Sequence, residues 1–220
     1  MQWTPNIIIA DADYVDRVAF DLTVNFERMI GRRIPKADMA RWVECVALDG
    51  GMRPSEDVLP HPAPEKTSLS GDSQTQVVLI HDSGRRQMEN FQPGDLAAEL
   101  NGKAFTGRLG EFVFSSTNPE GFTTKKSLFL DILRTALHAN EVQRLMIIPD
   151  EEYLSDVRRE LQVGDMPRDF HTTTKDSGSK SITVFTMQPV AGPFHQEILG
   201  YSLMAALGVK GSELKPDEGV

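Results

Sequence analysis

The sequence is poor in cysteine, contains no long apolar run and has fewer basic than acidic residues. Its single cysteine, Cys45, excludes an internal disulfide and a metal site with several cysteine ligands. No apolar stretch approaches the ~20 residues that a membrane-spanning helix needs. The N-terminal MQWTPN lacks the basic and long apolar regions of a secretory signal. We therefore expect a cytoplasmic protein that does not enter a membrane.

The charge balance also restricts the class of partner. Asp and Glu total 32 against 23 Lys and Arg, which gives a formal net charge of -9. Such a chain gains no general attraction to a polyanion, so any contact with RNA must use a local basic patch. The sequence also lacks a glycine-rich phosphate loop, a Cys/His zinc spacing and a nucleophile elbow. It therefore carries no sign of the enzyme classes that depend on these motifs.

Apolar segments of strand length alternate with helical patterns along the chain. This alternation predicts an α/β fold, a three-layer sandwich with a mainly parallel sheet of about five strands. The predicted strands are residues 6–13, 76–82, 111–115, 143–148 and 182–187. The predicted helices, the first with Asp13 as its N-cap, are residues 13–30, 35–50, 95–100, 124–139, 153–161 and 193–207.

The length of the chain predicts one domain. At 220 residues it can bury one substantial core and is short for two full domains. We expect the domain to occupy residues 1–207, followed by a frayed tail at 208–220. Residues 52–75 are rich in Pro, Ser, Gly, Asp and Glu and predict a flexible surface loop. Residues 164–180 predict a second polar loop.

Acidic residues follow two of the predicted strands. Asp11 and Asp13 end the first strand, and Asp150 and Glu152 follow the fourth. Ligands of parallel sheets bind beyond the carboxyl ends of the strands. If the two strands are neighbours, these acids converge, and the helix before the fourth strand can add Asp131. Clustered carboxylates are costly unless a cation compensates them, so we predict a Mg²⁺ or Mn²⁺ site.

Basic pairs border this predicted cleft. Arg85 and Arg86 follow the second predicted strand, and Lys125 and Lys126 lie near the start of the helix after the third. Cations at these positions would hold the phosphates of an RNA substrate beside the metal ion. Charged pairs are also common as solvated surface residues, so either pair alone is weak support.

Three motifs resemble those of the NYN group of PIN-like metal-dependent ribonucleases. Ile7–Asp13 is similar to the apolar strand that ends in a DxD-like motif in that group. Lys126–Asp131 is similar to its Lys-led segment with an Asp on the following helix. Leu145–Tyr153 is similar to its later strand, which ends in Ser-Gly-Asp-x-Asp-Phe. The resemblance implies a PIN-like fold and hydrolysis of an RNA phosphodiester by a water that Mg²⁺ or Mn²⁺ activates.

The same resemblance implies roles for individual acids. Asp11, Asp131 and Asp150 would be catalytic metal ligands, with Glu152 in place of the second Asp of the later motif and Asp13 as a further ligand. The chain as a whole also resembles an uncharacterised family of Bacteroidales bacteria, which implies no function.

Departures from these motifs leave two other interpretations open. Tyr14 stands where the NYN pattern usually has Asn, and Ile148-Pro149 replaces the small residues before Asp150. These changes favour a degenerate, non-catalytic PIN-like interaction module. Alternatively, Asp11-Ala12-Asp13-Tyr14-Val15 is similar to the first motif of haloacid-dehalogenase-like phosphatases, in which Asp11 would be the nucleophile. The helical pattern directly after Asp13 leaves no room for that family's loop and flap, which ranks this interpretation lower.

Overall fold

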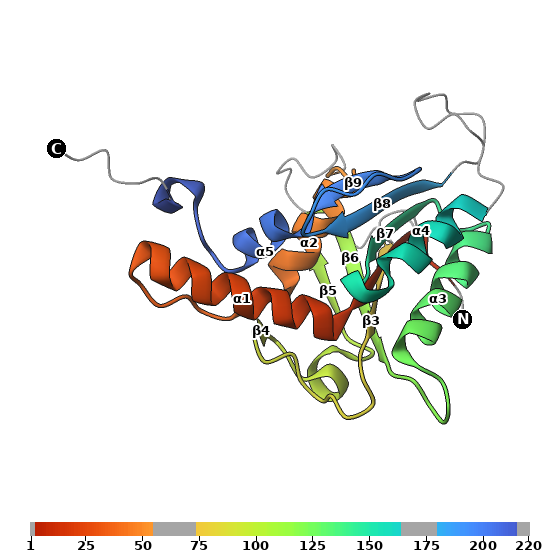
Figure 1. The fold of residues 1–220 in the computed structure, drawn as a ribbon, viewed down its shortest axis with the longest axis horizontal. Helices are drawn as coiled ribbons and strands as arrows, with labels where there is room; N and C mark the ends of the chain where they lie inside the picture. Colours follow the sequence, from red (N-terminus) through yellow and green to blue (C-terminus); the bar gives the residue numbers. More distant parts are fainter. Residues whose placement is uncertain (1–2, 55–73, 164–179, 215–220) are drawn as a thin grey trace, which may run out of the picture.

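The fold is built around a seven-stranded β-sheet (Figure 1). The computed structural model describes residues 3–54, 74–163 and 180–214. The strands of the sheet are β1 (Asn6–Asp11), β3 (Gln74–Ile80), β5 (Ala104–Gly107), β6 (Gly110–Thr117), β7 (Arg144–Ile148), β8 (Ser181–Thr186) and β9 (His195–Ile198). They lie in the order β5-β6-β3-β1-β7-β8-β9. Every neighbouring pair is parallel except β5 and β6, which form an antiparallel edge.

Helices cover both faces of this sheet. One face carries α1 (Ala12–Ile30), α2 (Met39–Asp49) and α5 (Leu199–Ala206), and the other carries α3 (Lys125–His138) and α4 (Leu154–Val163). The side chains of β1 alternate between the two cores, with Ile8 and Ala10 in the first and Ile7 and Ile9 in the second. All are fully buried, which explains why this strand is a continuous apolar run rather than an alternating one.

The α/β fold with a mainly parallel sheet flanked by helices is confirmed. All five predicted strands belong to the sheet, but the predicted number of about five is short by two. The additional strands, β5 and β9, each have four residues and form the two edges. β9 has the sequence HQEI, and its polar residues resemble a helix terminus, so residues 193–207 were wrongly predicted as one helix. α5 begins only at Leu199.

Two helix starts also differ from the prediction. Asp11, not Asp13, is the N-cap of α1, and its carboxylate accepts a hydrogen bond from the backbone N–H of Tyr14 at 2.9 Å. α2 begins at Met39 with Asp38 as its N-cap, because the Asp38 side chain accepts from the backbone of Arg41. In both helices an aspartate at the end of a strand also caps the helix that follows.

Short elements complete the described part of the chain. β2 (Ala37–Asp38) pairs with β4 (Phe91–Gln92), and the predicted helix at 95–100 is a single π-helical turn, η3 (Leu96–Leu100). Two 3₁₀ turns are η4 (Glu151–Tyr153) before α4 and η5 (Gly211–Leu214) within the predicted tail. The predicted loops at 52–75 and 164–180 lie almost wholly outside the described residues.

No described helix has both the length and the apolar character needed to cross a bilayer.

The long helix α1 continues well past the sheet (Figure 1). It has 19 residues, and its buried side chains are confined to its first eight positions, from Ala12 to Ala19. The rest of the helix is only partly covered, by α5 and the η5 turn. Phe20 and Met29 are largely exposed there. The first two turns of α1 therefore belong to the core and to the sheet edge, whereas the later turns present side chains outward.

Candidate functional site

The strand order creates a topological switch point beside β1. Connections from β1 lead to β3 on one side, while β7 and β8 continue the sheet on the other, so the order reverses between β1 and β7. Open parallel sheets bind ligands at such a switch point, outside the carboxyl ends of the strands. Asp11 is the last residue of β1, and Asp150 follows β7 by two positions. Predicted strands one and four are neighbours, which was the condition for their acids to converge.

Asp11 is completely buried and its carboxylate is fully engaged. One oxygen accepts from the Tyr14 backbone N–H at 2.9 Å and from Lys125 Nζ at 3.1 Å. The other accepts from the Tyr153 hydroxyl at 2.5 Å and lies 3.0 Å from Lys125 Nζ. Burial raises the pKa of Asp11 above its ordinary value, although Tyr153 and Lys125 oppose that rise by stabilising the carboxylate. Burial beside Asp11 likewise raises the pKa of Tyr153.

Lys125 supplies the positive charge at the centre of the acidic cluster. Its Nζ lies 2.9 Å from Asp13, 3.0 Å from Asp11 and 3.4 Å from Asp82, and its side chain is 15% exposed. Burial lowers the pKa of Lys125, but the negative charge of Asp11 and the hydrogen bonds to both aspartates outweigh it, so the pKa is raised overall. The Lys125 side chain is therefore an ammonium ion at neutral pH.

Asp13 and Asp16 join this cluster to the loop after β3. Asp13 accepts from the backbone N–H of Asp82 at 2.8 Å and lies 3.3 Å from Nε of Arg85. Burial alone would raise the pKa of Asp13, but its bonds to Lys125 and to the Asp82 backbone lower it overall. Asp16, one helical turn further, is buried and pairs with the Arg85 guanidinium. Its oxygens also accept from the backbone N–H groups of Glu89 at 3.1 Å and Asn90 at 2.8 Å.

Asp150 is buried in a neighbouring ion pair. Its carboxylate accepts from Arg17 at 3.0 Å and, as the N-cap of η4, from the backbone of Glu152 at 3.0 Å. The Arg17 guanidinium lies over the Tyr14 ring, 5.4 Å from its centroid. The Tyr14 hydroxyl donates to Glu151 at 3.2 Å. Asp150 thus reaches the switch point but uses Arg17 as its counter-ion.

Four of the predicted site residues have their side chains outside the cluster: Asp131, Glu152, Arg86 and Lys126. Asp131 is 64% exposed and pairs with Arg134 at 2.9 Å on the outer surface of α3. It follows Lys125 by six residues, which is ~9 Å along the helix axis. The side chains of Glu152 and Arg86 are exposed. Lys126 pairs with Asp156. Asp131 lies on the outer surface of α3, Glu152 is exposed and Asp150 pairs with Arg17. The predicted ligand set Asp11, Asp13, Asp131, Asp150 and Glu152 therefore does not converge on one point.

Sequence reasoning missed residues that the cluster depends on. Asp16 interrupts the apolar stripe of α1 one turn after Asp13, and a charged residue in a buried stripe is a signal that could have identified it. Tyr153, whose hydroxyl binds Asp11, and Arg17, which binds Asp150, gave no comparable signal, because their contacts join elements far apart in the sequence.

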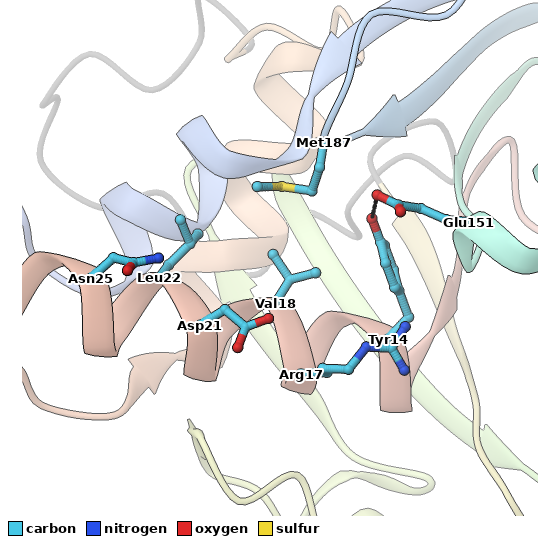
Figure 2. A pocket seen from close by; sticks show the side chains of 8 residues that line it. All are labelled: Tyr14, Arg17, Val18, Asp21, Leu22, Asn25, Glu151 and Met187. Carbon is cyan, nitrogen blue, oxygen red and sulfur yellow. Dashed lines mark hydrogen bonds between the residues drawn. The ribbon is translucent and has the colours of Figure 1, made fainter.

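A groove of about 230 Å³ opens beside Asp150, between α1 and the chain that follows β8 (Figure 2). Val18 and Leu22 of α1 and Met187 after β8 provide its apolar surface. Figure 2 shows the Tyr14 ring at one end of the groove, reaching up to Glu151. The polar side chains that line the groove are Tyr14, Arg17, Asp21, Asn25 and Glu151.

A comparison with known families identifies the family of the chain. The model of the Family of unknown function (DUF6621) matches residues 1–214. The chain belongs to this family. No curated protein and no solved structure matches this DUF6621 chain. Family membership names no activity, so the chemistry of the site has to be argued from its residues.

The residues of this DUF6621 site do not fit a divalent metal. The Lys125 ammonium lies between Asp11 and Asp13, within 3.1 Å of both, where a metal shared by these carboxylates would have to lie. A cation there would be repelled by Lys125 and would have to displace the bonds to Tyr153 and to the Tyr14 backbone. Among the described residues, no group of three or more His, Cys, Asp or Glu side chains is arranged to hold a metal ion.

Proposed function

We propose that this DUF6621 protein is a non-catalytic PIN-like interaction module, in which Lys125 takes the place of a metal ion. The observation that carries the proposal is the position of the Lys125 ammonium between Asp11 and Asp13, with Asp11 fully buried. The PIN-like part rests on the motif resemblance and on the parallel sheet with β1 at its centre and Asp11 at the carboxyl end of β1.

The hydrogen bonds of Asp11 support a structural rather than a chemical role. A carboxylate has about four lone-pair sites. In Asp11 the Tyr14 N–H, the Tyr153 hydroxyl and contacts of Lys125 with both oxygens occupy them. A metal ligand, a general base or a nucleophile needs a free lone pair directed at its target. Asp11 therefore suits neither the nuclease nor the phosphatase mechanism in this arrangement.

The basic residues beside the site support the same proposal. Three of the four cations predicted to hold RNA phosphates are paired with acids: Lys125 with Asp11 and Asp13, Arg85 with Asp16, and Lys126 with Asp156. Only the exposed Arg86 makes no ion pair among the described residues. Together with a net charge of -9, this leaves little attraction for a polyanion.

The test is a combined assay of metal binding and hydrolysis. Mn²⁺ is titrated into the full chain by calorimetry, and the same samples are incubated with single-stranded RNA and with p-nitrophenyl phosphate. We expect no saturable Mn²⁺ binding and no hydrolysis above the buffer control. Lys125→Gln removes the internal cation and is expected to gain Mn²⁺ binding, provided that circular dichroism shows a folded variant. Mn²⁺-dependent hydrolysis by the wild type that is lost in Asp11→Asn but retained in Asp131→Asn would disprove the proposal.

A further inference from the structure

The groove beside Asp150 carries polar groups that no described residue satisfies. Asp21 and Asn25 line it from α1, and neither side chain makes a hydrogen bond or ion pair with another described residue. Both side chains are exposed. Glu151 accepts only from the neutral Tyr14 hydroxyl, so its negative charge has no counter-ion among the described residues. The groove therefore differs from the ion-paired cluster next to it in having groups available to a ligand.

The charge of the groove is suited to a cation. Among the described residues that line the groove, the only basic side chain is Arg17, which is already paired with the buried Asp150. Asp21 and Glu151 have no counter-ion among the described residues. Val18 lies between these acids, and Leu22 and Met187 add apolar surface beside them. The side chains of lysine and arginine combine an aliphatic stem with a charged end, so they match this alternation of apolar and acidic surface. A methionine side chain is flexible, so Met187 can pack against the aliphatic part of a lysine or of an arginine side chain.

The length of the groove indicates a peptide rather than a small amine. Its lining residues on α1 extend from Tyr14 to Asn25, which is ~16 Å along the helix axis. An extended peptide covers that length with about five residues. Glu151 and Asp21 lie near different parts of this length, with Glu151 beside Tyr14 and Asp21 two helical turns further along (Figure 2).

From these observations we infer that the groove between α1 and Met187 binds an extended basic segment of a partner protein, with lysine or arginine side chains directed to Asp21 and Glu151. This inference rests on the proposed function, because it names the kind of partner that the interaction module recognises. The aliphatic parts of the bound side chains pack on Val18 and Met187. Asn25 provides an amide for the peptide backbone.

The experiment measures binding of a fluorescein-labelled Lys-Ala-Lys-Ala-Lys-Ala-Lys peptide to the full chain by fluorescence anisotropy at physiological salt. We expect saturable binding by the wild type and none of the matching Glu-Ala peptide. An exposed ion pair accounts for up to about a fivefold change in affinity, so Asp21→Asn is expected to weaken binding about two- to fivefold, and Asp21→Lys to weaken it further. Asp131→Asn, the same change of charge on the outer surface of α3, is the matched control and should bind like the wild type.

Two further measurements separate local from general attraction. The ¹³C-methyl signal of Met187, assigned with Met187→Leu, should shift on addition of the peptide and remain unshifted in Asp21→Lys. Equal weakening by Asp131→Asn and Asp21→Asn would show attraction to net charge alone and overturn the inference. If spermidine, at the same concentration of positive charge, competed with the labelled peptide as well as the unlabelled peptide does, the inference would also be overturned. A small amine would then be enough to occupy the groove.

The outcomes distinguish this inference from the proposed function. Absence of peptide binding together with absence of Mn²⁺-dependent hydrolysis would remove the basic partner and leave the non-catalytic module intact. Hydrolysis that requires Asp11 would remove the proposed function itself, whatever the peptide does.

Discussion

A lysine in the first turn of a helix is unfavourable, because the helix N-terminus carries a partial positive charge. α3 begins with two, Lys125 and Lys126. Lys125 is tolerated there because its ammonium lies against Asp11, Asp13 and Asp82, whose negative charge exceeds the effect of the helix dipole. At the scale of single residues, the site is therefore a set of ion pairs in which Lys125 stabilises the charges of Asp11 and Asp13, and they stabilise its charge.

Removal of Lys125 should therefore be costly. We expect Lys125→Met to lower the free energy of unfolding by about 3–5 kcal/mol, because it leaves the fully buried Asp11 carboxylate without its counter-ion. The pKa of Lys125 is raised, so its contribution is fully present below the unfolded pKa of ~10.4 and is lost only as pH rises through the folded value. Urea unfolding from pH 7 to 10 should show a constant difference from the wild type. Lys126→Met, at the exposed neighbour, should cost less than ~1 kcal/mol, and equal losses in the two variants would contradict the argument.

Asp13 should show the opposite dependence on pH. Its pKa is lowered in the folded state, so its contribution is present above the unfolded value of ~3.9 and is lost as pH falls through the folded pKa. Asp13→Asn is expected to cost about 1.5–3 kcal/mol at pH 7, the range for a hydrogen bond to a charged group. The difference from the wild type should shrink in urea titrations below pH ~4. If the difference in free energy of unfolding between the wild type and Asp13→Asn increased as the pH fell, the predicted pH dependence would be wrong.

At the scale of elements, Asp16 connects α1 to the loop after β3. Its buried carboxylate accepts hydrogen bonds from the backbone N–H groups of Glu89 and Asn90. Asp16→Ala should therefore loosen the loop. Hydrogen exchange at these two amides is expected to speed up at least about tenfold, which corresponds to the loss of one charge-assisted hydrogen bond. Asp21→Ala, on the same helix but without a described partner, should leave both amides unchanged. Unchanged exchange in Asp16→Ala would mean that the loop is held by other contacts.

The elements differ in how far the sequence could predict them. β1 was predictable because a strand buried on both faces is a continuous apolar run, and α3 was predictable because Thr124 caps a clear helical stripe. β9 could not be predicted in the same way. It pairs with β8 through backbone hydrogen bonds, and its sequence, HQEI, has no apolar pattern that indicates a strand. For the site, the sequence indicated Asp11, Asp13 and Lys125 individually. Their ion pair depends on where α3 starts relative to β1, which no local pattern contains.

At the scale of the whole molecule, the acidic balance and the paired cations should prevent RNA binding. The wild type is expected to show no saturable binding of a labelled single-stranded RNA at physiological salt, measured by fluorescence anisotropy. Arg86→Ala should not change this result, since a single exposed cation contributes little. If the wild type bound RNA tightly and Arg86→Ala abolished that binding, a local basic patch that includes Arg86 would bind RNA despite the net charge of -9.

The central position of β1 also determines when the sheet can form. Asn6 pairs with Thr75 on one side and with Arg144 on the other, so neither partner of β1 is close in sequence. Long-range pairing of this kind slows folding, because large loops must close before the contacts form. During synthesis β1 emerges before both of its partners, and β7 emerges after β3. Until β7 has been made, the apolar run Ile7–Ile9 has no strand on its β7 side, and an unpaired apolar strand edge of this kind is prone to aggregation.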